Sequence, residues 1–397
     1  MKRIGHKRLE CLFSFVIQLI LMGIKELTDS IKSEALALGF NLVGISPADK
    51  FPENQFYKQW LSKGYAGRMK YMERNPERRQ DVRQIIPDAK SVISCALNYN
   101  TDHPYSIRET DKTKGWVARY AWGDDYHDVM DRKLGSLGEF ISEKISPGAV
   151  SRHYVDTGPV LEKVYGKYAG IGWVGKNTCL INQEIGSWIF LGEIITSLEL
   201  EYDNPAPDRC GTCTKCLDAC PTDALPEPYV LDSRRCISYL TIELKDNIPF
   251  ELRDKIDNNI FGCDICQDVC PWNKRAEKTD EPAFLPREGI YNPDLGSLSQ
   301  LSPEDFRNFF KGSPVKRAKR RGLLRNVLTA MGNSGNRSFV QLVKDCLSDE
   351  EPLVRVHAAW ALWKLEGQGA RGTLLRQREN EDAPEVLEEI DFLLNNI

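Results

Sequence analysis

The sequence lacks a large excess of charge of either sign, a hydrophobic run of membrane-spanning length and coiled-coil heptads. Its 53 basic and 57 acidic side chains leave a formal net charge of -4. No overall basic field therefore marks a nucleic-acid-coating protein, and any such site must be a local patch. Since no heptads suggest a coiled-coil dimer, we expect a monomer.

The N-terminal residues carry one apolar stretch, from Cys11 to Met22, which is too short to cross a bilayer. Four basic residues precede it, as in a secretory signal peptide: Lys2, Arg3, Lys7 and Arg8. Against export, Glu10 and Gln18 interrupt the stretch and no small-residue cleavage site follows. An ordinary helical pattern then begins near Met22, so we expect residues 1–21 to be a non-essential extension.

Cysteine is concentrated in one segment, with eight of the twelve between Cys210 and Cys270. The first four follow the bacterial ferredoxin spacing C-x2-C-x2-C-x3-C-P, and the last three repeat part of it, with Ile260 where the leading cysteine would fall. The lone Cys236 completes the number. Because the fourth cysteine of such a run serves the other cluster, the spacing predicts two [4Fe–4S] clusters, one held by Cys210, Cys213, Cys216 and Cys270, the other by Cys220, Cys236, Cys263 and Cys266.

Two other uses of cysteine fit this pattern less well. Zinc sites favour two separated C-x2-C pairs rather than three cysteines at successive spacings of two. A disulfide framework suits short secreted chains, whereas here the thiols crowd into one part of 397 residues. Thiolate clusters need a reducing compartment, so the sequence favours the cytoplasm.

The chain divides into three parts by pattern. Residues 22–205 alternate helical and strand patterns: a helix at 24–39, strands at 41–45, 91–99 and 188–200, a long amphipathic helix at 124–144, and a strand ending near Asp156 before a helix at 159–169. Residues 206–290 form the cysteine-rich module, and residues 300–397 are helical. We therefore predict an α+β protein with an N-terminal α/β domain, a ferredoxin-like module and an all-α domain.

Two similar units stand in the helical part, each introduced by an acidic run and a proline. Pro352 and Pro384 are 32 residues apart and precede helices at 353–365 and 385–394. The first helix resembles the second helix of HEAT-like repeats, which bury a core only by stacking on neighbours, here on the cysteine-rich module. A plain helical bundle is the alternative. Ser302, Pro303 and Asp305 also predict a capped helix start.

A basic segment, Lys311–Arg325, carries seven basic residues and no acidic one. Such a run is usually a solvated face, but like charges repel and are best compensated by a phosphate backbone. The acidic tail from Glu379 to Asp391 hides the segment from the net charge. The sequence thus offers a nucleic-acid site formed by Lys316, Arg317, Lys319, Arg320, Arg321 and Arg325.

Several longer motifs resemble those of the epoxyqueuosine reductase family, the cobalamin-dependent iron–sulfur enzymes of queuosine biosynthesis in tRNA. The resemblance runs from about Met22 to Leu365 and includes the cysteine order and the helical tail. It is dense at E-R-R (77–79), P-D-A-K-S (87–91), A-R-Y-A-W-G-D-D-Y-H (118–127), Y-V-D-T-G-P-V-L-E (154–162), G-I-G-W-V-G-K-N (170–177), G-S-W-I-F-L-G-E (186–193) and R-C-I-S-Y-L-T (235–241).

The resemblance implies a base-off cobalamin in the N-terminal domain, although the residues alone do not reveal it: no D-x-H-x-x-G run offers a lower histidine ligand. It also implies the reaction, in which cob(I)alamin attacks the epoxide, two [4Fe–4S] clusters relay electrons and a carboxylic acid supplies a proton. An external low-potential electron donor would feed the clusters. The predicted partner is tRNA carrying epoxyqueuosine.

The family's catalytic aspartate corresponds to Asp156, at the end of a strand where side chains face a cleft. An acid acts as donor near neutral pH only if burial raises its pKa. From the sequence alone, Asp156 could instead cap the helix that follows Pro159. The resemblance further implies that the corrinoid is lined by Arg79, Ala118, Asp156, Leu180, Leu191 and Ser238.

Two other functions compete with this hypothesis. A two-cluster electron carrier would leave the large N-terminal domain and the basic segment without a role. A reductive dehalogenase-like corrinoid enzyme acting on a small molecule would not need a phosphate-binding surface.

Overall fold

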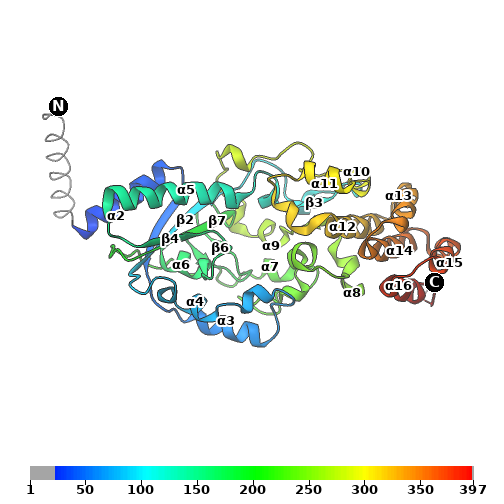
Figure 1. The fold of residues 1–397 in the computed structure, drawn as a ribbon, viewed down its shortest axis with the longest axis horizontal. Helices are drawn as coiled ribbons and strands as arrows, with labels where there is room; N and C mark the ends of the chain where they lie inside the picture. The colour runs from blue at the N-terminus through cyan, green and yellow to red at the C-terminus, as the bar shows by residue number, and fades with distance from the viewer. Residues whose placement is uncertain (1–22, 396–397) are drawn as a thin grey trace, which may run out of the picture.

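The computed structural model describes residues 23–395. The molecule is elongated, with a β-sheet and its helices at one end and a stack of C-terminal helices at the other (Figure 1). The predicted extension, residues 1–21, lies outside the described residues. Within the described range, no helix combines the length and apolar content needed to cross a membrane.

A four-stranded antiparallel sheet forms the centre of the N-terminal part, in the order β1-β2-β7-β4. The strands are β1 (Leu42–Pro47), β2 (Ser91–Asn98), β7 (Ile189–Thr196) and β4 (Ser151–Tyr154). The central strand β2 is buried along its whole length, which agrees with its mostly apolar sequence. The expected strands are therefore present, but the prediction of an α/β domain is wrong, because their antiparallel pairing makes this part α+β.

Helices cover both faces of the sheet (Figure 1). On one face, α2 (Ile24–Ala37) and α5 (Tyr126–Phe140) bury Ile31, Met130 and Leu134 against sheet residues such as Ile93 and Ile194. On the other face lies α6 (Glu162–Tyr168), which begins three residues later than the sequence suggested. Two further helices, α3 (Glu53–Ser62) and α4 (Pro76–Gln80), border this second face.

The cysteine-rich segment consists mostly of loops. Two single-turn helices, α7 (Lys215–Asp218) and α9 (Ile265–Asp268), lie within the two cysteine runs and contact each other. Strand β8 (Asn259–Phe261) pairs in parallel with β3 (Trp116–Val117), and a small hairpin joins β5 (Trp173–Val174) to β6 (Leu180–Ile181). Helix α8 (Phe250–Arg253) leads into β8. The β3–β8 pair ties this segment to the N-terminal part.

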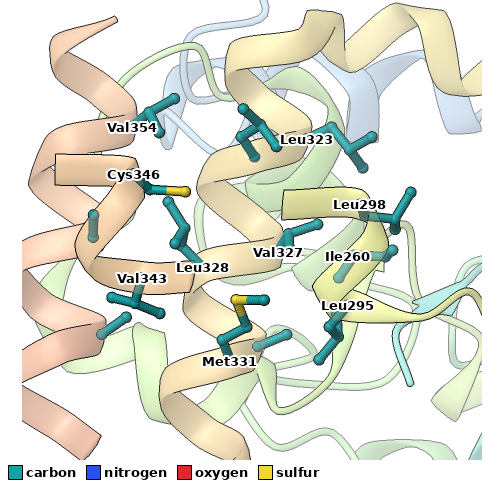
Figure 2. Close-up of a cluster of buried hydrophobic side chains, with 14 of the residues drawn as sticks. Ile260, Leu295, Leu298, Leu323, Val327, Leu328, Met331, Val343, Cys346 and Val354 are labelled. Atoms are coloured by element: carbon teal, nitrogen blue, oxygen red, sulfur yellow. The ribbon is translucent and has the colours of Figure 1, made fainter. Parts of the chain in front are cut away.

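The C-terminal part is helical, as predicted. It contains α10 (Leu295–Ser299), α11 (Pro303–Phe309), α12 (Lys319–Ser334), α13 (Val340–Asp345), α14 (Pro352–Glu366), α15 (Arg371–Glu379) and α16 (Pro384–Asn395). Ser302 and Asp305 form the expected capping box of α11. Figure 2 shows Leu323, Val327 and Met331 of α12 among side chains of α10, α13, α14 and β8. Whether these helices count as HEAT-like repeats stays a prediction.

Helix α12 is also bound to the cysteine-rich segment by hydrogen bonds. The Arg325 guanidinium donates to the backbone carbonyls of Leu240, Leu244 and Asp246. The Asn326 amide donates to the carbonyls of Thr241 and Ile260. Both side chains are fully buried, so this contact is part of the protein core.

Candidate active site and cluster-binding segment

Asp156 follows the edge strand β4 by two residues, as the sequence predicted. Its backbone has a φ of 54°, a left-handed conformation that residues other than glycine rarely adopt. Its side chain does not cap a helix, because α6 begins only at Glu162 and its N-cap Leu161 makes no side-chain cap. Instead the Tyr126 hydroxyl donates to Asp156 Oδ2 at 2.9 Å. The helix-cap alternative is therefore wrong.

His127 lies between two carboxylates. Its Nδ1 is 2.7 Å from Asp125 Oδ1, and its Nε2 is 3.7 Å from Asp156 Oδ2. Burial alone would lower the pKa of His127, but interaction with Asp125 and then Asp156 outweighs burial and raises it to about 9. The imidazole is thus protonated at neutral pH.

The charge of His127 determines the state of both neighbouring acids. Its proximity holds the pKa of Asp156 below the ordinary value, even though burial acts in the opposite direction. The pKa of Asp125 falls to about 2, because hydrogen bonds from His127 and Lys316 exceed the effect of burial. The condition for a donor, a pKa raised by burial, is therefore not met by Asp156, because the interaction with His127 lowers its pKa instead.

A cavity of about 1070 Å³ opens beside these groups, and we call it the Asp156 cavity. Its walls come from α4, α5, the loop after β4, the start of α6 and two distant segments: Ile242–Glu243 of the cysteine-rich part and Pro314–Arg317 of the basic segment. Small-molecule pockets are about 300–1,000 Å³, so this one has room for a large macrocycle.

Only two of the six predicted cofactor-binding residues line the Asp156 cavity. Arg79 and Asp156 belong to its lining, and the buried Arg79 Nε has no hydrogen-bond partner. Ala118, Leu180 and Leu191 are largely covered by protein and lie outside the lining. Ser238 also lies outside it, beside the Cys236 thiol. An unpartnered N–H on the wall of a large cavity fits a cofactor that offers carbonyl oxygens.

The eight cysteines fall into two groups. Cys210, Cys213, Cys216 and Cys270 line one cavity of about 240 Å³. In the second group, Cys263 lies near Cys220 and Cys236, and Cys266 near Cys236 and Cys263. Among residues 23–395, no three His, Cys, Asp or Glu side chains could hold a single metal ion. The first group instead surrounds a space, which suits a larger, four-iron guest.

The basic side chains of the Lys311–Arg325 segment differ in exposure. Lys311, Lys316, Arg317 and Lys319 are exposed. Lys316 pairs with Asp125 at 3.1 Å and Arg317 with Glu243 at 3.0 Å, whereas Lys311 and Lys319 have no ion-pair partner within the described residues. Lys319 has φ 60° and ψ 163°, a backbone region almost restricted to glycine.

The remaining arginines of the segment face inward to different degrees. Arg320 is only 17% exposed, with its guanidinium bound to Asp349 and to the Leu301 carbonyl. Arg321 is half-buried, 3.7 Å from Glu351. Arg325 is 0% exposed. The prediction that Arg325 contacts nucleic acid is therefore wrong, because this side chain cannot reach a phosphate.

Sequence reasoning did not single out Tyr126, His127, Glu162 or Glu193 as functional, although all four belong to the quoted motifs. Tyr126 and His127 could have been found from their position directly after Asp125, which caps the start of α5. From the sequence, Cys179 is expected to be a buried apolar cysteine; in the structure it lies beside the cluster-run residue Cys266.

Comparison with known proteins gives consistent results. Residues 79–157 match the family model described as "Epoxyqueuosine reductase QueG, DUF1730", and residues 209–273 match a 4Fe-4S double cluster binding domain. The epoxyqueuosine reductase of Cellulophaga algicola is 46% identical over 307 residues, 76% of this chain and 96% of the relative. That of Escherichia coli is 38% identical over 345 residues, 86% and 90% of the two chains.

Solved structures agree with these relatives. An epoxyqueuosine reductase crystallised with an epoxyqueuosine-modified tRNA-Tyr stem loop superposes with a TM-score of 0.88 at 33% identity, over 94% of this chain and 99% of that one. A Bacillus subtilis epoxyqueuosine reductase, whose aspartate-bearing catalytic loop is swung out of the active site, gives 0.87 at 32% identity, with the same coverage.

A double-cluster segment joined to an α+β domain with an acid–imidazole site on a large cavity defines an iron–sulfur oxidoreductase. The identities and coverage decide which one. The chain belongs to the epoxyqueuosine reductase family, as the motifs indicated.

Proposed function

We propose that this chain reduces epoxyqueuosine to queuosine at the wobble position of tRNA. One observation carries the proposal: the cavity that contains Asp156 is also bordered by Lys316 and Arg317 of the basic segment. A nucleotide in the cavity would leave its phosphates beside these cations. The relative crystallised with a modified stem loop supports the same class of substrate.

The cluster ligands are the two predicted sets: Cys210, Cys213, Cys216 and Cys270 for one, Cys220, Cys236, Cys263 and Cys266 for the other. When bound, the two clusters supply electrons one at a time at low potential. Lys176 supports the first set by donating to the carbonyls of Gly211 and Cys213. An external low-potential donor reduces the clusters, and the cytoplasm provides the reducing conditions that the thiolates need.

The Asp156 cavity is the proposed place for a base-off cobalamin. Its volume and the unpartnered Arg79 Nε support this assignment. When bound, cobalamin supplies a strongly reducing cobalt centre for attack on the strained epoxide. Arg79 would orient it by a hydrogen bond, while Ala118, Leu180, Leu191 and Ser238 remain proposed contacts to parts of the cofactor outside the present lining.

Asp156 passes a proton to the epoxide oxygen, and His127 is the group that holds this proton beforehand. His127 is protonated at neutral pH and 3.7 Å from the Asp156 carboxylate. A small movement of either side chain brings them within hydrogen-bonding distance. Tyr126 keeps the Asp156 carboxylate facing the cavity. In the B. subtilis relative the corresponding catalytic loop is swung out of the active site, so the inward position needs contacts that hold it.

The RNA surface comprises the exposed Lys316, Arg317 and Lys319 with Arg321, joined by Lys311. Arg320 contributes mainly through its ion pair with Asp349. In domain terms, residues 22–205 bind cobalamin, residues 206–290 hold the clusters, and residues 300–397 bind tRNA. The enzyme acts as a monomer.

The test is single turnover of an epoxyqueuosine stem loop by anaerobically reconstituted protein, with loss of one oxygen from the RNA followed by mass spectrometry. Wild type converts the RNA; Asp156→Asn binds clusters, cobalamin and RNA but does not convert it. Conversion by Asp156→Asn at the wild-type rate would refute the proton-delivery role. Iron incorporation without retention of cobalamin would refute the reductase and favour the electron-carrier alternative.

A further inference from the structure

Glu193 is an acidic residue in the middle of a buried strand. It lies on β7, opposite Ser94 of β2 and Tyr154 of β4, and is 0% exposed. Neither carboxyl oxygen has a hydrogen-bond donor, and the neighbouring Ser94 hydroxyl is also unpartnered. A carboxylate without donors is unstable in such a place, so Glu193 requires a proton.

The carboxyl group that acts on Glu193, through its charge and through a side-chain hydrogen bond, belongs to Glu162, at the start of α6. Two ionised carboxylates this close would repel strongly in a buried site, whereas one shared proton turns repulsion into a hydrogen bond. Burial and the Glu162 charge raise the pKa of Glu193; burial and the Asp156 charge raise that of Glu162.

The pair is directly connected to the catalytic loop. The backbone N–H of Asp156 donates to Glu162 Oε1 at 2.5 Å. Asp156 is the residue with the left-handed φ, a strained conformation that persists only when its surroundings hold it. The hydrogen bond to Glu162 is one of the contacts that hold it. Asp156 is therefore held at two points: Tyr126 binds its carboxylate and Glu162 its backbone.

We propose that Glu162 and Glu193 share one proton and that this acid pair, through Glu162, holds Asp156 in its inward conformation. They are positioning residues, and the inference rests on the proposed role of Asp156 in proton delivery. Other titratable groups face the pair: Asp156 and Lys163 near Glu162, the Cys95 thiol near Glu193, and, across Asp156, Tyr126 and His127. Among these groups, Lys163 and His127 carry positive charge.

The pair makes the loop sensitive to pH. A carboxyl pKa that is raised in the folded protein means that the proton is present at neutral pH and is lost as the pH rises further. The site then holds two buried negative charges beside the Asp156 carboxylate. Their repulsion weakens the hold on the loop, so turnover declines on the alkaline side.

The experiment compares Glu162→Ala, Glu162→Gln, Glu193→Gln and the exposed control Glu139→Gln in full-length reconstituted protein. Hydrogen–deuterium exchange of the peptide with Asp156 reports the hold on the loop. Glu162→Ala is expected to speed its exchange about tenfold and to lower kcat about tenfold, with KM for the stem loop within about twofold, as for loss of one hydrogen bond. Glu162→Gln, whose amide oxygen still accepts, should restore both.

Glu193→Gln tests proton sharing, because its amide always donates to Glu162. It should leave neutral-pH turnover unchanged and extend activity to higher pH. Infrared spectra of the wild type should show the C=O band of a protonated buried carboxyl, absent from Glu193→Gln and unchanged in Glu139→Gln. Wild-type exchange and kcat in Glu162→Ala, or no such band in the wild type, would overturn the proposal. Normal turnover by Asp156→Asn would instead remove the proposed function, with exchange and infrared results unaffected.

Discussion

Lys319 combines an unfavourable backbone conformation with an exposed, unpaired charge, and Lys319→Gly should separate the two. A residue other than glycine at φ 60° and ψ 163° is strained by about 1–3 kcal/mol. Glycine removes the strain but costs about 0.5–1 kcal/mol in unfolded-state entropy. We expect a net stabilisation of about 0.5–2 kcal/mol, seen as a rise of about 0.5–2.5 °C in the thermal unfolding midpoint.

The same substitution should weaken RNA binding. Loss of one phosphate contact lowers the slope of log affinity against log salt by about 0.7–0.9. At about 0.1 M salt this corresponds to roughly fivefold to eightfold weaker affinity. The assay is fluorescence anisotropy of a labelled anticodon stem loop at several salt concentrations.

Three matched variants complete the test of Lys319. Lys319→Ala should weaken RNA binding equally but keep the strain, so its midpoint should not rise. Lys144→Ala and Arg337→Ala remove exposed charges outside the segment and should change neither quantity. A Lys319→Gly protein that is less stable, or that keeps the wild-type salt slope, would refute the reasoning.

Three further predictions concern the site and its supports. His127→Asn should abolish most turnover while retaining cobalamin. Because the pKa of His127 is raised, its charge stabilises the fold below pH 6.5, and this stabilisation is lost as the pH rises through about 9. The difference in stability between wild type and variant, measured by denaturant unfolding, should therefore vanish above about pH 9. Arg325→Met leaves three carbonyls unsatisfied and should cost about 3 kcal/mol or more, with no change in the salt slope of RNA binding; an altered slope would return Arg325 to the RNA surface. Cys236→Ser should reduce iron from about eight to about four per chain and remove one set of EPR signals, while Cys179→Ser keeps about eight.

The spacing of the cysteines and the end of strand β4 were accessible from sequence because each depends on local order. Ligands of one cluster come largely from one loop, and the residue after a strand lies at the sheet edge. The capping box at Ser302 is local in the same way. These features needed no knowledge of distant contacts.

Arg325 and His127 show where sequence reasoning fails. Charge pattern placed Arg325 with its exposed neighbours, but the backbone carbonyls that bury it come from residues about 80 positions earlier in the chain. The state of His127 depends on Asp125 and on Asp156, a residue of a different element. Burial and pKa are set by such long-range contacts, which periodicity does not contain.

Helix α12 physically links two parts of the proposed function, the RNA surface and the segment that carries the cluster ligands. It begins at Lys319, which belongs to the proposed RNA surface, and six residues later Arg325 donates a hydrogen bond to the carbonyl of Leu240, which follows Cys236 by four residues. That is about 9 Å of helix, a distance over which an α-helix does not bend appreciably. In the proposed function, one rigid helix would therefore connect the RNA surface to the segment that holds the proposed cluster ligand Cys236.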